Sequence, residues 1–177
     1  KEVEDVLDKV KKALEEIRER NKRVNDEIRR LLDEVRRRNE DADREIEEIL
    51  KRVADEVRDT DLERIIEELK KRVEEVIRRS RRLAEEIKKT IEEAVRRTRK
   101  LAEDLKREID DVLKRVETEE LRERIKAVVE EVERVMDELR RSNEKVVREV
   151  EDVMRRLEER NRRTLERIEE VLERLKR

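Results

Sequence analysis

The chain has 177 residues, of which 60% are Asp, Glu, Lys or Arg, yet its formal net charge is only −2. Glycine, proline, cysteine, histidine and all aromatic residues are absent, which excludes disulfides, thiolate and imidazole chemistry, and the stacking of bases on aromatic rings. A charged fraction of about 25% is usual in a soluble domain, but the 33% of residues that are apolar follow a strict period, which argues against disorder.

Residues 1–58 are predicted to form the first helix, because their apolar residues repeat every 18 positions, as in Val10, Ile28 and Ile46. Eighteen residues make five turns at 3.6 residues per turn, so the stripe runs straight along an untwisted α-helix. One series in this stripe is polar in its middle. It reads Val3, Asn21, Asn39, Val57.

A first turn is predicted between Val57 and Leu62, because these successive apolar residues are five positions apart, whereas those before them are three or four apart. Thr60 and Glu63 form a capping box, a pattern typical of a helix N-terminus. The second helix is expected over about residues 61–117, with the same 18-residue repeat. Its apolar series include Leu69, Ile87, Leu105 and Ile65, Leu83, Leu101, and its polar series reads Leu62, Ser80, Thr98, Val116.

A second turn is predicted where the stripe jumps again, from Val116 to Leu121. Thr118 is the expected N-cap, with Glu119 and Glu120 suited to the positive end of the helix dipole. The third helix is expected over residues 119–177. Its polar series reads Ile125, Asn143, Asn161.

The three polar series are expected to meet in two buried layers if the helices fold back on one another. In this register Asn21 lies level with Thr98 and Asn143, and Asn39 lies level with Ser80 and Asn161, about 27 Å further along at 1.5 Å per residue. Asn25 and Ser142 lie at the edge of the first layer. A buried amide without a partner costs about 1–3 kcal/mol, so we expect hydrogen bonds inside each layer.

These layers are expected to specify register, because sliding one helix would leave amides in an aliphatic environment. A small polar binding cavity or a proton path is the alternative, which we disfavour because amides and hydroxyls do not titrate near neutral pH. The predicted fold is all-α: an antiparallel up-down-up three-helix bundle, untwisted, one domain over residues 1–177, and an elongated rod about 85 Å long. One long helix in a multi-chain coiled coil is disfavoured by the two jumps in the stripe.

The chain resembles computationally designed, parametrically generated straight three-helix bundles with buried hydrogen-bond networks. The resemblance covers the whole chain and rests on the 18-residue repeat, the two polar layers, the charged surface and the two similar turns. It implies a very stable scaffold without a natural biological role. Such designs often have glycine in their loops, and this chain has none.

An enzyme is not expected, since histidine and cysteine are absent and the Asp and Glu residues we can place lie outside the apolar arcs. For the same reason we expect no metal and no cofactor. Basic runs such as Arg36–Arg38 are offset by acidic neighbours one turn away, so no nucleic-acid partner is expected.

No apolar run approaches the roughly 20 residues of a membrane span. Residues 1–5 already follow the amphipathic pattern, so neither a membrane partner nor a signal peptide is expected. We expect a soluble monomer that requires no partner and has no natural location, made in the cytoplasm of an expression host. The alternative function is a helical interaction module or a building block of a homo- or hetero-oligomer. Its signature would be a second apolar stripe, and only scattered alanines such as Ala54 and Ala127 stand outside the first.

Overall fold

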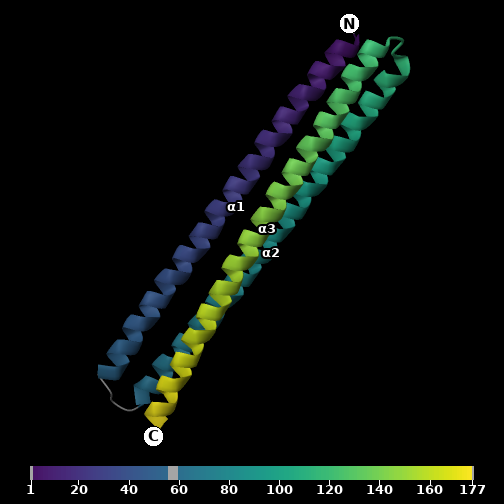
Figure 1. Cartoon of the computed structure of the whole chain (residues 1–177). Helices are drawn as coiled ribbons and strands as arrows, with labels where there is room; N and C mark the ends of the chain where they lie inside the picture. The colour runs from purple at the N-terminus through teal and green to yellow at the C-terminus, as the bar shows by residue number, and fades with distance from the viewer. Residues whose placement is uncertain (1, 56–59, 177) are drawn as a thin grey trace. The chain divides into compact units, whose positions relative to one another are not determined.

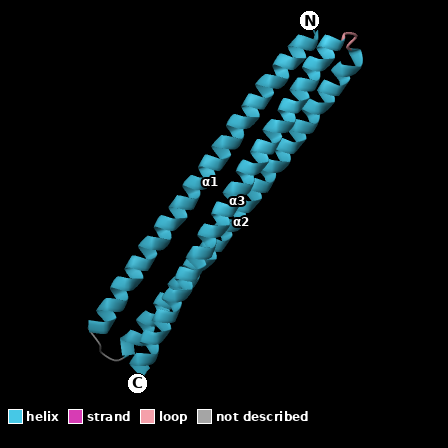
Figure 2. Cartoon of the chain, viewed as in Figure 1, coloured by secondary structure: helices cyan, strands magenta, loops and turns pink. Residues whose placement is uncertain are grey.

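The computed structural model describes the backbone of residues 2–55 and 60–176 and the side chains of residues 2–53 and 63–174. These residues form three α-helices and no strand (Figures 1 and 2): α1 at Glu2–Asp55, α2 at Thr60–Arg115 and α3 at Glu119–Lys176. The all-α, three-helix prediction is therefore confirmed. The predicted end of the first helix, at residues 56–58, lies outside the described residues.

The helices form because no residue in them interrupts helical geometry. Glycine and proline, the two strongest helix breakers, are absent from the chain. Each helix is apolar on one face and charged on the others, and exposed side chains pair one turn apart, as Arg38 does with Glu34 and Arg79 with Glu75.

The chain divides into two compact units, each built from one segment of every helix. Unit 1 comprises Lys1–Ile28 and Lys88–Val147, and unit 2 comprises Arg29–Ile87 and Arg148–Arg177. The single domain, the straightness of the bundle and its length stay predictions.

Ion pairs show the directions of the helices inside each unit. Most of those between α1 and α3 join residues 120 positions apart, as Arg18 with Glu138 and Arg124 with Glu4 in unit 1, so these two segments are parallel. In unit 2, Arg29 pairs with Glu149 by the same rule. In unit 2, Lys70 of α2 pairs with Glu169 of α3 and Arg81 of α2 with Glu158 of α3. Residue numbers rise on one helix as they fall on the other, so these two segments are antiparallel.

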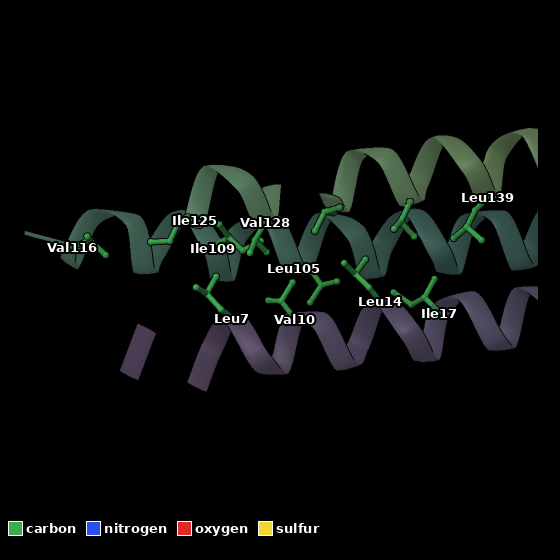
Figure 3. Packing of buried hydrophobic residues seen from close by; sticks show 12 residues of the cluster. Leu7, Val10, Leu14, Ile17, Leu105, Ile109, Val116, Ile125, Val128 and Leu139 are labelled. Atoms are coloured by element: carbon green, nitrogen blue, oxygen red, sulfur yellow. The ribbon is translucent and has the colours of Figure 1, made fainter. Parts of the chain in front are cut away.

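Each unit has its own aliphatic core. In unit 1, Leu7, Val10 and Leu14 of α1 point toward Ile109 of α2 and Val128 of α3 (Figure 3). The core of unit 2 has the same kind of composition and also draws on all three helices. One cluster of buried residues there consists of Ile46, Leu50, Val53, Ile66, Leu69, Val73 and Ile168.

The apolar stripe of α2 is wider than the face that α1 and α3 cover. Ile66 is fully buried, whereas its neighbour Ile65 is 37% exposed and Leu101 is 40% exposed. Leu83, in the same 18-residue series, is half-buried. Ile65 and Leu101 of this apolar series are thus only partly covered, because neighbouring residues point about 100° apart around a helix, and here Ile66 and Ala102 take the inward direction.

The turn between α2 and α3 occupies Val116–Thr118. The Val116 amide donates to the Leu113 carbonyl at 3.4 Å, and the Thr118 carbonyl accepts from the Arg122 amide at 3.3 Å. Thr118 thus holds the N-cap position, directly before the first residue of α3. At the other turn, the side chain of Thr60 lies outside the described residues and Glu63 is exposed, so the predicted capping box stays a prediction.

Candidate functional site

The polar side chains in the core of unit 1 form an interhelical group between α1 and α3. Asn25 Nδ2 donates to Asn143 Oδ1 at 3.2 Å and lies 3.2 Å from Ser142 Oγ, also within hydrogen-bonding distance. Asn25 and Asn143 are buried, and Ser142 is half-buried. Asn25, expected only at the edge of the layer, is therefore the residue that bonds Asn143.

Asn21 and Thr98, the other two residues predicted for this layer, do not join that group. Asn21 is buried on α1, and Thr98 is half-buried on α2. The Thr98 hydroxyl donates to the Ala94 carbonyl at 2.8 Å, one turn back on its own helix. A threonine can satisfy its hydroxyl in this way without a second helix. Asn21 and Thr98 both line a hollow between α1 and α2.

In unit 2 two of the three corresponding residues are buried, and no hydrogen bond among the described residues joins the three to one another. Asn39 is 1% exposed and Asn161 is also buried, whereas Ser80 is half-buried. Asn39 Nδ2 donates to Asp43 Oδ2 at 3.5 Å, along its own helix. Within the described part of the chain, Asn39 Oδ1 has no hydrogen-bond partner. The expectation of hydrogen bonds inside each layer is thus wrong for Asn39.

Asp43 is a half-buried carboxylate that the sequence pattern alone did not reveal. Burial raises the pKa of Asp43 above its usual value of 3.8. The Arg160 guanidinium, whose Nε is 2.8 Å from Asp43 Oδ2, lowers this pKa, and the charges of Glu47 and Glu40 raise it. Asp43 follows Asn39 by four residues, a spacing that places both on the same face of α1. That spacing is the signal that could have identified it.

Each unit has a hollow between α1 and α2 that is lined by described residues. The hollow of unit 1 has a volume of about 610 Å³, and the hollow of unit 2 about 570 Å³. We call them the unit 1 hollow and the unit 2 hollow. The unit 1 hollow is lined by Ile17, Arg20, Asn21, Arg23, Val24, Ala94, Arg97, Thr98, Lys100, Leu101 and Asp104. The unit 2 hollow is lined by Val35, Arg38, Asn39, Asp41, Ala42, Glu45, Arg72, Glu75, Val76, Arg79, Ser80, Arg82, Leu83 and Glu86.

The chemistry available in these hollows is hydrogen bonding, apolar contact and ionic interaction with the charged side chains of their linings. In the residues that the structure describes, no group of three or more Asp or Glu side chains is arranged to hold a metal ion. No helix among the described residues is long and apolar enough to span a membrane.

Structural comparison finds that this chain is similar to a solved structure described as a computationally designed three helix bundle. The two are 22% identical, the alignment covers 98% of this chain and 88% of that chain, and the TM-score is 0.37. No family model matches the sequence, and comparison with curated proteins gives no match. Values this low transfer neither a function nor a partner to this chain.

Proposed function

We propose that this chain is a designed structural scaffold whose buried amide and hydroxyl side chains select the register of its helices. The observation that carries this function is the interhelical group of Asn25, Asn143 and Ser142, placed among aliphatic side chains in unit 1. The chain is further proposed to be a soluble monomer without catalytic activity, able to accumulate in the cytoplasm of an expression host.

The selection of register depends on which side chains lie one turn away from Asn143. Leu139 and Val146 flank it on the same face of α3, and both are buried. A slide of one turn, about 5.4 Å, would place the Asn25 amide against one of these aliphatic side chains. An amide left unpaired in this way costs about 1–3 kcal/mol, which favours the register that is present.

The proposal that the chain is not an enzyme rests on its ionisable groups. Histidine and cysteine are absent, and the half-buried carboxylate of Asp43 is engaged by Arg160. A carboxylate held in an ion pair has little freedom to act as a base on a substrate.

The test is a variant in which the buried polar residues become aliphatic. It carries Leu at Asn21, Asn25, Asn39, Asn143 and Asn161 and Val at Ser80 and Thr98. We expect an equal or higher thermal midpoint, but broadened amide resonances or mixed oligomers in place of one species, because apolar layers alone permit several registers. NMR amide spectra and light-scattering mass measure both properties.

The matched control replaces seven exposed lysines with arginine and leaves the core unchanged, so it should keep the native spectrum. The native mass should be that of one chain, 21.8 kDa. Sharp spectra and the same mass for the apolar variant would overturn the register function. A native mass of two or more chains would instead favour an oligomeric building block.

A further inference from the structure

Asn21 brings a buried amide without a hydrogen-bond partner to the unit 1 hollow. Asn21 is 6% exposed and lines this hollow, and no described residue forms a hydrogen bond with its side chain. Among the buried and half-buried residues that the structure describes, Asn39 Oδ1 is the one side-chain polar atom that is both fully enclosed and unpaired. The amide atoms of Asn21 therefore keep contact with the hollow, where a bound polar group would give them a partner.

Apolar side chains form the walls of the unit 1 hollow beside this amide. They are Ile17 and Val24 of α1 and Ala94 and Leu101 of α2, and Leu101 is 40% exposed. The volume of about 610 Å³ lies within the range of about 300–1,000 Å³ that is usual for small-molecule sites. Along α1 the lining from Ile17 to Val24 extends over about 10 Å at 1.5 Å per residue. The walls therefore have room for a short aliphatic chain.

The rim of the unit 1 hollow carries an excess of positive charge. Its charged residues are Arg20, Arg23, Arg97, Lys100 and Asp104. Arg23 pairs with Glu19, whereas no described carboxylate pairs with the other three cations. Arg20 and Arg97 each follow a glutamate by four residues, yet neither forms an ion pair with it. This rim is complementary to an anionic ligand.

The unit 2 hollow, taken by itself, has no such excess of charge. Its lining has equal numbers of arginines and carboxylates, namely Arg38, Arg72, Arg79 and Arg82 with Asp41, Glu45, Glu75 and Glu86. Arg38 pairs with Glu34, and Arg79 pairs with Glu75. These two arginines stand 18 residues from Arg20 and Arg97 in the sequence repeat. An anion site is therefore favoured in unit 1, and unit 2 supplies matched control positions.

We propose that the unit 1 hollow binds a medium-chain aliphatic carboxylate. The carboxylate group accepts a hydrogen bond from Asn21 Nδ2 and pairs with the guanidinium groups of Arg20 and Arg97. The alkyl chain lies against Ile17 and Leu101, which removes apolar surface from water. This inference concerns unit 1 alone, goes beyond the scaffold function and does not depend on it.

The size and charge of the hollow favour this ligand over two other occupants. A lining of about 10 Å is about two helical turns, so it would cover only a short part of a partner helix, whereas it encloses most of a medium-length alkyl chain. A second copy of the chain would bring its own basic rim against this one, and the like charges would repel each other.

The probe is sodium decanoate, titrated into the full chain at pH 7 below its micelle concentration and followed by isothermal titration calorimetry. We expect one saturable site with a Kd below about 1 mM. Hexanoate, which has a shorter tail, should bind about tenfold or more weakly. Decyltrimethylammonium, which has the same tail and the opposite charge, should not saturate the site. These comparisons use the native chain, so they do not depend on the folding of any variant.

Two variants test the groups that hold the carboxylate. Asn21→Leu should weaken decanoate binding by about tenfold, because a hydrogen bond to a charged group is lost. Arg20→Gln combined with Arg97→Gln should weaken it by about fivefold or more. Arg38→Gln combined with Arg79→Gln is the matched control, since both residues line the unit 2 hollow, and it should keep the native Kd. Circular dichroism checks the helicity of every variant.

A third variant should strengthen binding, a result that loss of structure cannot produce. Asp104→Asn removes the carboxylate from the rim of the unit 1 hollow, so decanoate should bind about twofold or more tightly. Asp110→Asn is its control, because Asp110 is exposed on the same helix and lines neither hollow. In NMR spectra the side-chain amide resonances of Asn21 should shift with added decanoate, and those of Asn161 should not.

The proposal is overturned if decanoate shows no saturable binding at about 1 mM, or if hexanoate or decyltrimethylammonium binds equally well. It is also overturned if Asn21→Leu or the double arginine variant of unit 1 keeps the native Kd, or if Asp104→Asn does not strengthen binding. Light scattering that gives two chains for the native protein and one for Leu101→Glu would overturn it as well, since the occupant would then be a second copy.

Discussion

At the scale of single residues, Asn25 and Asn143 depend on each other more than on the rest of the core. Each is buried, and the hydrogen bond between them crosses from α1 to α3. If Asn25 becomes apolar, Asn143 keeps the cost of a buried amide without this interhelical hydrogen bond, and if Asn143 becomes apolar, Asn25 keeps only the hydrogen bond to Ser142. If both become apolar, neither buried amide is left to be satisfied and the two costs disappear together, and of the group only the half-buried Ser142 hydroxyl remains.

The prediction from this coupling is a non-additive pair of mutations. Asn25→Leu and Asn143→Leu should each lower the free energy of unfolding by about 1–3 kcal/mol, and the double variant should lose less than either single variant. Urea unfolding followed by circular dichroism measures all three. Additive losses in the double variant would show that the hydrogen bond between Asn25 and Asn143 does not carry the effect.

The second prediction at the residue scale concerns Asp43 and the pH dependence of the stability of the fold. Because burial raises the pKa of Asp43 in the folded chain above its usual value of 3.8, the ionised carboxylate destabilises the fold. That cost is absent below pH 3.8 and complete once the pH exceeds the raised pKa. Asp43→Asn, which cannot ionise, should therefore unfold at a higher urea concentration than the native chain at pH 7, and this advantage should vanish below pH 3.8.

The control for Asp43 is Asp137→Asn, because Asp137 is an exposed carboxylate paired with Arg140. Both variants lose one negative charge, so a difference between them reports the environment of Asp43. If Asp43→Asn were less stable than the native chain at pH 7, the ion pair with Arg160 would outweigh the burial of the carboxylate.

At the scale of elements, the helices are set by local sequence and their ends by capping. α3 begins at Glu119, directly after Thr118, and Thr118 already accepts the first backbone hydrogen bond of the helix. Glu119 and Glu120 occupy its first turn, where negative charge is favourable to the helix dipole. The N-terminus of α3 therefore has a defined structure without any glycine in the turn.

The corresponding prediction is that Thr118→Ala lowers the free energy of unfolding by about 1 kcal/mol, because an N-cap oxygen can accept from the first amides of the helix. Thr164→Ala is the comparison in the middle of α3, where the hydroxyl only bonds the Arg160 carbonyl of the same helix. This second variant should change stability by at most about 0.5 kcal/mol. Equal losses in thermal or urea unfolding would contradict a capping role for Thr118.

At the scale of the whole molecule, charge dominates the surface but contributes little to stability. Apart from the pair of Arg160 with the half-buried Asp43, ion pairs between helices, such as Arg18 with Glu138 and Arg81 with Glu158, involve side chains that are about half exposed or more. Pairs of this kind contribute about 0–1 kcal/mol each. The apolar cores of the two units carry most of the stabilisation.

The prediction at this scale is a weak salt dependence. An increase from about 0.05 M to about 1 M sodium chloride shortens the screening length to about 3 Å, and the free energy of unfolding should fall by no more than about 2 kcal/mol. Urea, which is uncharged, is the suitable denaturant for this measurement. Loss of cooperative unfolding at high salt would show that ion pairs hold the helices together.

Much of the fold could be predicted because the helical period places each residue around its own helix axis. The three helices were expected within a few residues of their observed bounds, and Asn21, Asn39, Asn143 and Asn161 lie on the buried faces. The hydrogen-bond partners could not be predicted in this way. Asn25 reaches Asn143 because of the way α1 and α3 pack in unit 1. The period of one helix does not predict which residue of another helix it contacts.

By itself, the sequence determined the helices, their order, their apolar faces and the absence of imidazole and thiol chemistry, since these follow from residue type and spacing along one chain. Only the tertiary structure decided how wide a part of each face is covered. It leaves Leu101 exposed, Asp43 half-buried and Asn39 Oδ1 without a donor in the described residues. The physical reason is that periodicity sets angles within a helix, whereas burial depends on how closely the neighbouring helices approach.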